Sequence, residues 1–464
     1  MIRLLGQYIP VKTLILAITE IALIVGSITL AAWIRFGNLA DTSWYLSRPY
    51  AATQVAVTLV VCWICLYYND LYDLQVVARR AELIIHLMQA VGMTTLVLAC
   101  VYYLVPDLAL GRGVSALATV VIFASLLTWR LAVDAGDFLR PVRRVLIAGT
   151  GVSGVRLVRD ILARPELNIK VVGFLDERGE RIGESLVNPG IIGGVAEIRD
   201  WVKRERADWV VLAFAERRGV MPTGDLLKLK LSGIRVEDAH TVYERMTGSV
   251  MLERLSPSWL FLSEGFRSDF LVTFAKRIAD VMVSSIALVL VSPLLPLISL
   301  AIVLESGRPV LFRQERVGLQ GRVFAILKFR SMRKDAEQGG PAWATRGDIR
   351  VTRIGRFLRR YRLDELPQLV NVLRGDMSLV GPRPERPEFV RLLEDQIPFY
   401  NERHSIRPGL TGWAQIKYQY GSSVEDTKTK LEYDLFYIKH LSLFLDLAIM
   451  FRTVQVVLFA RGSR

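Results

Sequence analysis

Long apolar stretches dominate the first third of the sequence. Four of them are long enough to cross the hydrocarbon core of a bilayer as helices, at residues 14–34, 51–68, 83–105 and 114–133. Basic residues lie before the first stretch, between the second and third, and after the fourth, which places both ends of the bundle in the cytoplasm. We expect no cleavable signal peptide, because the first stretch is too long and lacks a small-residue cleavage site. Residues 1–140 are therefore predicted to form four transmembrane helices.

After the fourth stretch the pattern changes to short apolar strands separated by polar helical stretches. The predicted strands lie at 145–148, 170–175 and 209–213. A charged helical stretch precedes the third strand, and strands that alternate with helices are typical of a parallel α/β fold. We therefore expect a small Rossmann-like α/β domain over residues 141–250.

A glycine loop follows the first of these strands. Gly149, Gly151 and Gly154 form a GxGxxG pattern before a helix, and Asp176 ends the next strand. In a dinucleotide site such glycines let the backbone approach a pyrophosphate at the helix N-terminus, and the acidic residue binds a ribose hydroxyl. The domain is short for a full dinucleotide fold, however, and such modules also serve as structural or regulatory units. Both roles are open for this loop.

A fifth apolar stretch, 271–304, is interrupted in its middle. Ser292, Pro293 and Pro296 lie at the interruption, and two prolines this close break or sharply bend a helix. If the chain turns back there, each arm is too short to span a bilayer and the helix leaves on the side it entered. We predict a re-entrant membrane helix, reached through a linker at residues 251–270.

The final part, residues 305–464, holds most of the residues suited to chemistry. Asp364 and Glu365 are adjacent and precede a proline and an apolar-periodic run, which predicts the start of a helix. Backbone amides there favour an anion such as a phosphate, while a carboxylate pair can hold Mg²⁺ or attack phosphorus. Ordinary helix capping by Asp364 is the alternative.

Cations are unusually dense around this pair. They are Arg313, Arg316, Lys328, Arg330, Arg353, Arg356, Arg359, Arg360, Arg362, Arg383 and Arg386. Several phosphates would need such a set, although a basic face resting on lipid head groups would also explain part of it. The candidates for contact with substrate phosphates are Lys328, Arg330, Arg359 and Arg383.

Two loops look rigid enough to hold a substrate. Arg383 lies between two prolines, whose fixed backbone would orient its guanidinium toward a phosphate. Arg407, Thr411 and Gln415 belong to a second loop with Gly, Pro and Trp, which can receive a base or ribose or can be an ordinary turn. We take these three as candidate nucleotide contacts.

Composition narrows the chemistry further. The formal net charge of +14 suits anionic lipid or phosphorylated substrates, although nucleic acid would fit the charge equally well, and 52% of residues are hydrophobic. The three cysteines lie in apolar stretches, and the four histidines form no cluster, which argues against disulfides and zinc sites. No Ser-His-Asp spacing and no Walker A loop is present. Hydrolytic and zinc chemistry are therefore not expected.

Four motifs combine these features: KFRSM at 328–332, LDELPQ at 363–368, GPRPE at 381–385 and RPGLTG at 407–412. Together they resemble the bacterial polyprenol-phosphate hexose-1-phosphate transferases. The catalytic resemblance covers about residue 275 to the end of the sequence, and four helices followed by an α/β domain are similar to the family's long subgroup. This implies a multi-domain membrane protein with an α-rich, monotopic catalytic domain.

The resemblance implies a ping-pong reaction with a UDP-hexose. Asp364 would attack the phosphorus next to the sugar, expel UMP and form a phosphosugar-aspartyl intermediate, from which undecaprenyl phosphate takes the sugar phosphate. Glu365 would help Asp364 to bind Mg²⁺, and Lys328, Arg330 and Arg383 would hold phosphates. Either carboxylate is a candidate nucleophile, because adjacent carboxylates can exchange roles.

The resemblance also bears on location and partners. It implies a homodimer in the bacterial inner membrane, in contact with membrane lipid and with its globular domains in the cytoplasm. Ser292 and Pro293 match the helix break that makes the family's membrane segment re-entrant. The expected product begins an exopolysaccharide or another surface glycan, and no nucleic acid partner is expected.

Two other classes of protein compete with this interpretation. An NAD-dependent enzyme that modifies sugar nucleotides would need a Tyr-x-x-x-Lys pair after the glycine loop, but Tyr243 is followed four residues on by Thr247. A non-enzymatic membrane scaffold that senses a nucleotide through its α/β domain would not need the carboxylate pair. Substitution of Asp364 separates the scaffold from the transferase, since a scaffold should tolerate the change.

Overall fold

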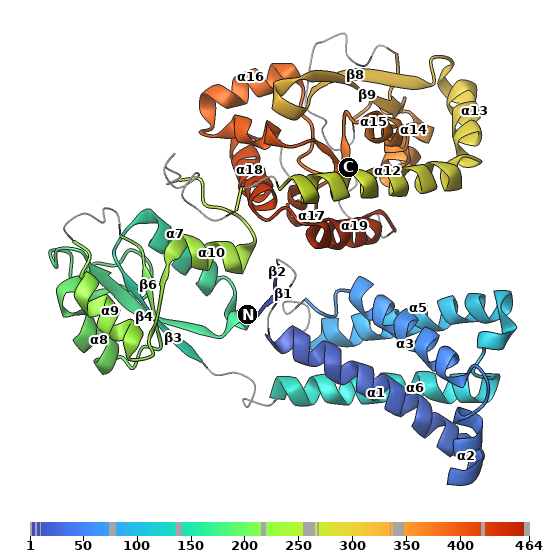
Figure 1. Cartoon of the computed structure of the whole chain (residues 1–464), viewed down its shortest axis with the longest axis horizontal. Helices are drawn as coiled ribbons and strands as arrows, with labels where there is room; N and C mark the ends of the chain where they lie inside the picture. The colour runs from blue at the N-terminus through green and yellow to red at the C-terminus, as the bar shows by residue number, and fades with distance from the viewer. Residues whose placement is uncertain are drawn as a thin grey trace. The chain divides into compact units, whose positions relative to one another are not determined.

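The computed structural model describes residues 2–4, 7–9, 11–73, 80–135, 142–214, 220–253, 265–266, 269–334, 336, 348–418 and 423–458. The chain forms two compact units, the first comprising Met1–Leu4 and Tyr8–Ala239 and the second Leu5–Gln7 and His240–Arg464. A helical bundle and an α/β sheet belong to the first unit, and an α-rich domain forms the second (Figure 1). Most of the predicted linker at 251–270 lies outside the described residues.

Four long helices form the bundle. They are α1 Val11–Phe36, α3 Ala51–Tyr68, α5 Arg80–Leu104 and α6 Arg112–Ala135, accompanied by strands β1 Ile2–Leu4 and β2 Gln7–Ile9, helix α2 Leu39–Leu46 and the 3-10 turn η1 Pro106–Leu108. Each long helix is apolar enough over sufficient length to cross a membrane, and no more than 33% of any such window is buried. Most of these residues therefore face outward, as lipid contact requires. The four predicted apolar helices are confirmed.

An ion pair lies inside this apolar bundle. Glu20 of α1 and Arg130 of α6 approach to 2.6 Å, and both side chains are fully buried. The Tyr72 hydroxyl donates to Glu20 at 2.8 Å, and Arg130 donates to the carbonyl of Leu71 at 2.5 Å. Charges in such surroundings are costly unless they are paired, so this contact fixes α1 against α6.

A five-stranded parallel sheet forms the α/β domain, as predicted. Its strands are β3 Arg143–Ala148, β4 Ile169–Asp176, β5 Ile191–Gly194, β6 Trp209–Leu212 and β7 Arg235–Asp238, with the helical segments α7 Val152–Leu162, η3 Pro165–Leu167, η4 Val195–Glu197, α8 Ile198–Arg204 and α9 Thr223–Leu231. The strand order is β5-β4-β3-β6-β7, so β3 is central. Its apolar residues Val145 to Ala148 are accordingly fully buried.

The second unit is α-rich and contains two small sheets. Its helices are α10 Ala239–Thr247, α12 Phe270–Val291, α13 Leu294–Ser306, α14 Arg353–Arg360, α15 Gln368–Arg374, α16 Pro387–Gln396, α17 Trp413–Lys417, α18 Val424–Lys439 and α19 Leu443–Leu458. The remaining elements are β8 Leu311–Val317, β9 Val323–Phe329, β10 Ser378–Val380, β11 Gly409–Thr411 and the 3-10 turns η5 Leu319–Gly321, η6 Leu363–Glu365 and η7 Tyr400–Ser405. Strands β8 and β9 pair antiparallel, whereas β10 and β11 pair in parallel.

Helix α10 packs on the second unit, although the sequence assigned residues up to 250 to the α/β domain. Glu244 accepts from Lys439 at 2.8 Å and lies 2.6 Å from the imidazole nitrogen of His440. The indole of Trp413 donates to the carbonyl of Gly248 at 2.7 Å. Residues 240–250 therefore belong to the second unit.

Helices α12 and α13 form a bent pair whose axes meet at 61° (Figure 1). Ser292 ends α12 and its hydroxyl donates to the carbonyl of Val289 at 2.8 Å. Pro293 occupies the cap position of α13, and Pro296 lies in the first turn of that helix, where a missing backbone N–H costs nothing. The helix is therefore bent at Ser292 and Pro293, but α12 has 22 residues and is longer than the short arm expected from the sequence, and the re-entrant path stays a prediction.

The first half of α12 anchors the unit through polar contacts. Lys276 donates to the carbonyl of Val380 at 2.9 Å and to Asp446 at 2.6 Å, and Asp280 accepts from the backbone N–H of Leu379 at 3.0 Å. The opposite face of α12 is apolar and exposed, and it continues onto α13. That face comprises Phe270, Leu271, Phe274, Ile278, Met282, Ile286, Val289, Leu290, Leu297, Leu300 and Leu304.

Candidate active site

The carboxylate pair lies on η6, the short 3-10 turn between α14 and α15. Arg362, immediately before it, has a φ of 54°, a left-handed conformation that non-glycine residues adopt only when their surroundings hold it. Leu363 packs into an apolar cluster, and the next two side chains, Asp364 and Glu365, are 8% and 7% exposed. The turn therefore buries two adjacent carboxylates rather than presenting them to solvent.

Glu365 is held by cations. One of its oxygens accepts from Arg383 at 2.9 Å, and the same oxygen lies 3.5 Å from the ammonium of Lys328 and 3.9 Å from the guanidinium of Arg362. Burial alone would raise the pKa of Glu365, but Arg383, Lys328 and Arg362 together hold it below its ordinary value. Glu365 is therefore a fixed, ionised group.

Asp364 is in a different situation. Among the described residues its carboxylate makes no hydrogen bond and no ion pair within 4.0 Å. Burial and the neighbouring charge of Glu365 raise its pKa above the ordinary value, and Lys328, Arg359 and Arg383 only partly oppose them. The two carboxylates thus have their pKa values pushed apart, an arrangement that separates chemical roles. The alternative role of helix capping finds no supporting contact.

The motifs that contain Arg383 and Arg407 interlock. Strands β10 and β11 pair so that Gly381 donates its backbone N–H to the carbonyl of Thr411 at 2.9 Å, and Gly409 donates to that of Pro382 at 2.9 Å. A Cβ on Gly381 would overlap the carbonyl of Arg407, and one on Gly409 would overlap Gly381. Glycine is therefore required where the two backbones touch, and the GPRPE and RPGLTG motifs form one structural unit.

Two arginines donate hydrogen bonds to the backbone of the loop that carries Arg383. Arg403, which is 6% exposed, donates to the carbonyl of Arg383 at 3.0 Å and to Asp434 at 2.8 Å. Burial raises the pKa of Asp434 to about 6, against the opposing charge of Arg403. Arg316 donates to the carbonyl of Pro384 at 3.0 Å. Sequence reasoning missed Arg403 and Asp434, because nothing local marks residues 31 positions apart as a buried pair.

The four candidates for phosphate contact divide into two groups. Lys328, Arg359 and Arg383 act on the carboxylate pair, and Arg359 also donates to the hydroxyl of Ser331 at 2.9 Å. Arg330 instead donates to the carbonyl and hydroxyl of Ser306, at 2.9 and 2.8 Å, and to the carbonyl of Gly307. It thereby caps the end of α13 and ties it to β9.

The candidate nucleotide contacts do not gather at one point. Arg407 donates to the carbonyl of Gly375 at 3.1 Å, at the end of α15, and the hydroxyls of Thr411 and Thr453 lie 2.7 Å apart. The side-chain oxygen of Gln415 is buried and has no hydrogen-bond partner within the described part of the chain. Within the described residues, Gln415 is the one of these three candidates with a buried polar atom that has no partner.

The glycine loop of the α/β domain uses its polar groups internally. Gly149 donates to the carbonyl of Leu175 at 2.9 Å, and Gly151 donates to that of Ala213 at 3.0 Å. The carboxylate of Asp176 accepts from its own turn, from the backbone N–H of residues 178 and 180 at 3.3 and 3.0 Å. Added Cβ atoms on Gly149 and Gly154 would overlap residues at the end of β6. These contacts support the structural role.

The carboxylate pair at η6 is compatible with a Mg²⁺ ion that takes only one or two ligands from the protein. No group of three or more His, Cys, Asp or Glu residues in the described ranges is arranged to hold a metal ion. Mg²⁺ often takes only one or two protein carboxylates and completes its shell with phosphate oxygens and water. Asp364 and Glu365 fit that mode, since neither has both oxygens occupied by described residues.

A buried carboxylate pair lies among cations, on a domain with an exposed apolar helix pair. This combination is typical of a membrane-associated enzyme that handles phosphate groups. The chain belongs to the bacterial sugar transferase family, whose pattern matches residues 271–460. Residues 67–222 match a second family, described as a CoA-binding domain. The family expected from the four motifs is confirmed.

Named relatives agree with this membership. The UDP-glucose:undecaprenyl-phosphate glucose-1-phosphate transferase of Xanthomonas campestris pv. campestris is 31% identical over 98% of this chain and 96% of its own length. The UDP-N-acetylgalactosamine-undecaprenyl-phosphate N-acetylgalactosaminephosphotransferase of Aeromonas hydrophila is 44% identical over 52% of this chain. The chain spans 56% of that relative, and 60% of an undecaprenyl-phosphate glucose phosphotransferase of Komagataeibacter xylinus that is 37% identical.

Proposed function

We propose that the protein transfers a hexose 1-phosphate from a UDP-sugar to undecaprenyl phosphate and releases UMP. The observation that carries the proposal is the contrast within the carboxylate pair: Glu365 is fixed by cations, whereas Asp364 makes no hydrogen bond to described residues. A carboxylate with available lone pairs beside clustered positive charge is suited to attack phosphorus. The names of the relatives supply the acceptor lipid and the class of donor.

The chemistry divides into two displacements at one phosphorus atom. An oxygen of Asp364 attacks the phosphorus bonded to the sugar, the bond from that phosphorus to the bridging oxygen breaks, and UMP leaves with the bond's electrons. A phosphate oxygen of the lipid then attacks the same phosphorus and displaces Asp364 as a free carboxylate. The products are UMP and a lipid diphosphate sugar, and the enzyme returns to its initial state.

Other residues of the chain support these two displacements in different ways. Arg383, whose backbone is gripped by Arg403, is held to receive phosphate oxygens, and Lys328 adds positive charge beside it. Arg359 favours the ionised form of Asp364, which is the form that attacks. When bound, the Mg²⁺ that the two carboxylates would hold offsets negative charge on the diphosphate.

The bent pair of α12 and α13 would place this chemistry at a membrane surface. Helix α13 has 13 residues, or about 20 Å at 1.5 Å per residue, which is too short for a hydrocarbon core of about 30 Å. A re-entrant arrangement would bury the exposed apolar face and return the chain to its starting side. With the bundle as anchor, both globular parts would lie in the cytoplasm, and the product would begin a surface glycan.

The test is UMP release by the purified full-length protein with Mg²⁺ and undecaprenyl phosphate. UDP-glucose, UDP-galactose and UDP-N-acetylgalactosamine are compared as donors, with Asp364→Asn as the inactive control. Release with at least one donor, abolished by the substitution, supports the transferase. Equal background from both proteins with every donor contradicts it and favours a scaffold.

A further inference from the structure

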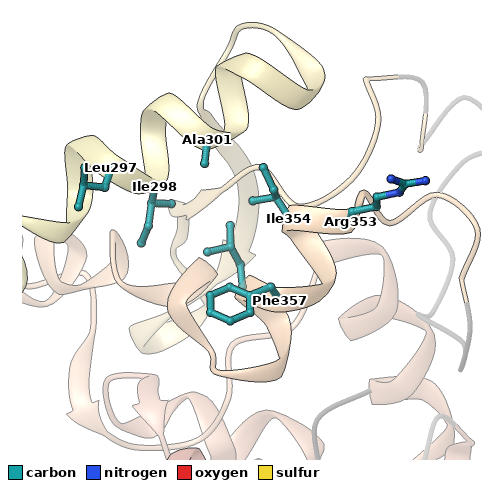
Figure 2. A pocket seen from close by; sticks show the side chains of 7 residues that line it. Leu297, Ile298, Ala301, Arg353, Ile354 and Phe357 are labelled. Carbon is teal, nitrogen blue, oxygen red and sulfur yellow. The ribbon is translucent and has the colours of Figure 1, made fainter.

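An apolar groove runs between α13 and α14 (Figure 2). Its volume is about 420 Å³, and the side chains that line it come from those two helices alone. They are Leu297, Ile298, Ala301, Arg353, Ile354, Phe357 and Leu358. Only Arg353 is charged, and Figure 2 shows it at one end of the row, pointing away from the others. Such walls offer no partners for the hydroxyls of a sugar or the amides of a base.

At one end of the groove, a carboxylate of α13 binds the start of α14. Glu305, near the end of α13, accepts from the backbone N–H groups of Arg353 and Ile354 at 2.8 and 3.0 Å. It therefore satisfies two of the free amides at the start of α14. Leu297 of α13 and Phe357 of α14 lie away from this contact, toward the other end of the groove. The groove therefore extends from Glu305 along two helices whose relative position is fixed.

The groove shares its wall with the candidate active site. Ile298 and Leu358, which line the groove, belong to the same apolar cluster as Leu363 and Leu366. Those two leucines flank the carboxylate pair in sequence. The residue after Leu358 is Arg359, whose charge favours the ionised form of the nucleophile. Only the short helix α14 thus lies between an open apolar groove and the carboxylate pair.

From this juxtaposition we infer that the groove holds the hydrocarbon chain of the acceptor, a polyprenyl phosphate, at the isoprene units near its phosphate. The inference rests on the proposed function. An acceptor of this kind needs an apolar surface for its chain close to the nucleophile, and the α13–α14 groove shares an apolar cluster with the two leucines that flank the carboxylate pair. A phospholipid acyl chain has similar chemistry, but its head group has no reason to lie beside the carboxylates.

The test separates the lipid step from the donor step. Exchange of labelled UMP into the UDP-sugar needs no acceptor lipid, whereas transfer to undecaprenyl phosphate does. Ala301→Phe should fill the groove and raise the KM for undecaprenyl phosphate about tenfold or more, the scale on which apolar pockets discriminate by small groups. Exchange should stay at the wild-type rate. Leu300→Phe, on the exposed side of the same helix, is the matched control and should change neither.

Each outcome has one meaning. If wild type shows no exchange with any donor, the proposed function fails. If wild type exchanges and Ala301→Phe transfers with an unchanged KM, the groove assignment is wrong. Should Ala301→Phe fold poorly, Phe357→Ser at the exposed rim is the substitute, again with a higher KM for the lipid and unchanged exchange.

Photolabelling distinguishes the two sources of hydrocarbon. A diazirine-bearing polyprenyl phosphate should label peptides that contain the groove residues, and undecaprenyl phosphate should compete with it. Phosphatidylglycerol at the same concentration should compete much less. Equal competition by phosphatidylglycerol would overturn the assignment to the acceptor and make the groove a general lipid contact.

Discussion

Two loops of this protein offered the chemistry of a phosphate site, and they differ in what their polar groups do. In the α/β domain, the backbone N–H of Gly151 and the carboxylate of Asp176 form hydrogen bonds within the domain. In the transferase unit, the turn at η6 buries a carboxylate, Asp364, without a hydrogen bond to described residues, while Glu365 takes the cations. Among the described residues, Gly151 and Asp176 thus have partners within their domain, whereas the carboxylate of Asp364 has none.

The contrast teaches that the partners of the polar groups can separate two candidate loops that sequence motifs alone leave open. A buried polar group without a partner costs free energy, so a fold retains it only where something else is gained. At η6 the cost also includes the raised pKa of Asp364 and the left-handed backbone of Arg362. The predictions below test whether the two loops differ in this way, in order of decreasing effect.

Asp364→Asn should abolish transfer and leave the fold intact. We expect activity to fall by about 10³-fold or more, as when a covalent nucleophile is removed. Because the folded state raises this pKa, the charged carboxylate destabilises the protein at neutral pH, so the melting temperature of the variant should equal or exceed that of wild type. UMP-exchange kinetics and thermal unfolding in detergent check both parts. Retained turnover would reassign the nucleophile.

Glu365→Gln should have the opposite effect on stability. Its lowered pKa means that the ionised form stabilises the fold at neutral pH, with that contribution lost only in acid. Removing one member of this ion group leaves only the charge of Asp364 to oppose Lys328 and Arg383, which costs at most roughly 3–5 kcal/mol of unfolding free energy. Glu402→Gln, on an exposed site, is the control. A melting temperature equal to wild type for Glu365→Gln would contradict the assigned structural role.

Arg403→Ala should loosen the loop that carries Arg383. A misplaced phosphate contact of this kind lowers kcat/KM by about 10²-fold. Arg403→Lys should recover only part of that loss, because an ammonium cannot reproduce the geometry that joins Asp434 to the loop carbonyl. Steady-state kinetics for the UDP-sugar provide the readout, with exposed Arg391→Ala as control. Equal activity of all four proteins would remove Arg403 from the positioning scheme.

The pH profile should carry the signature of Asp364. Its raised pKa means that the attacking form is lost, as pH falls, at a higher pH than for an ordinary aspartate of pKa 3.8. Arg359→Gln removes a cation that favours ionisation, so the acid limb of the exchange rate should move to still higher pH. Ser331→Ala, which frees Arg359 without removing its charge, should move it less. An unmoved limb in Arg359→Gln would disconnect that residue from the nucleophile.

Asp176→Ala in the α/β domain should have the smallest effect on catalysis. We expect transfer within about twofold of wild type and a loss of about 1–3 kcal/mol in stability, since two backbone amides lose their acceptor. Exchange kinetics and thermal unfolding test this. A large drop in activity with unchanged stability would instead return the glycine loop to the list of ligand sites.

Sequence patterns predicted the parts of this protein that depend on local chemistry. Apolar length alone gave the four helices, strand–helix alternation gave the parallel sheet, and Pro293 gave the break between α12 and α13. Contacts between segments that lie far apart in the sequence could not be predicted from sequence patterns. Arg330 has the chemistry of a phosphate contact, yet the position of α13 makes it a helix cap. Arg403 lies outside the motifs and takes its role from a partner on another helix.

The ion pair inside the bundle also bears on how the protein is made. During synthesis Glu20 emerges from the ribosome well before Arg130, because the second and third apolar stretches lie between them. Until Arg130 follows, the first helix carries an acidic group that lipid tolerates poorly. Stable residence of the first helix in the bilayer therefore depends on the last helix of the bundle, which makes the four segments a single unit of insertion.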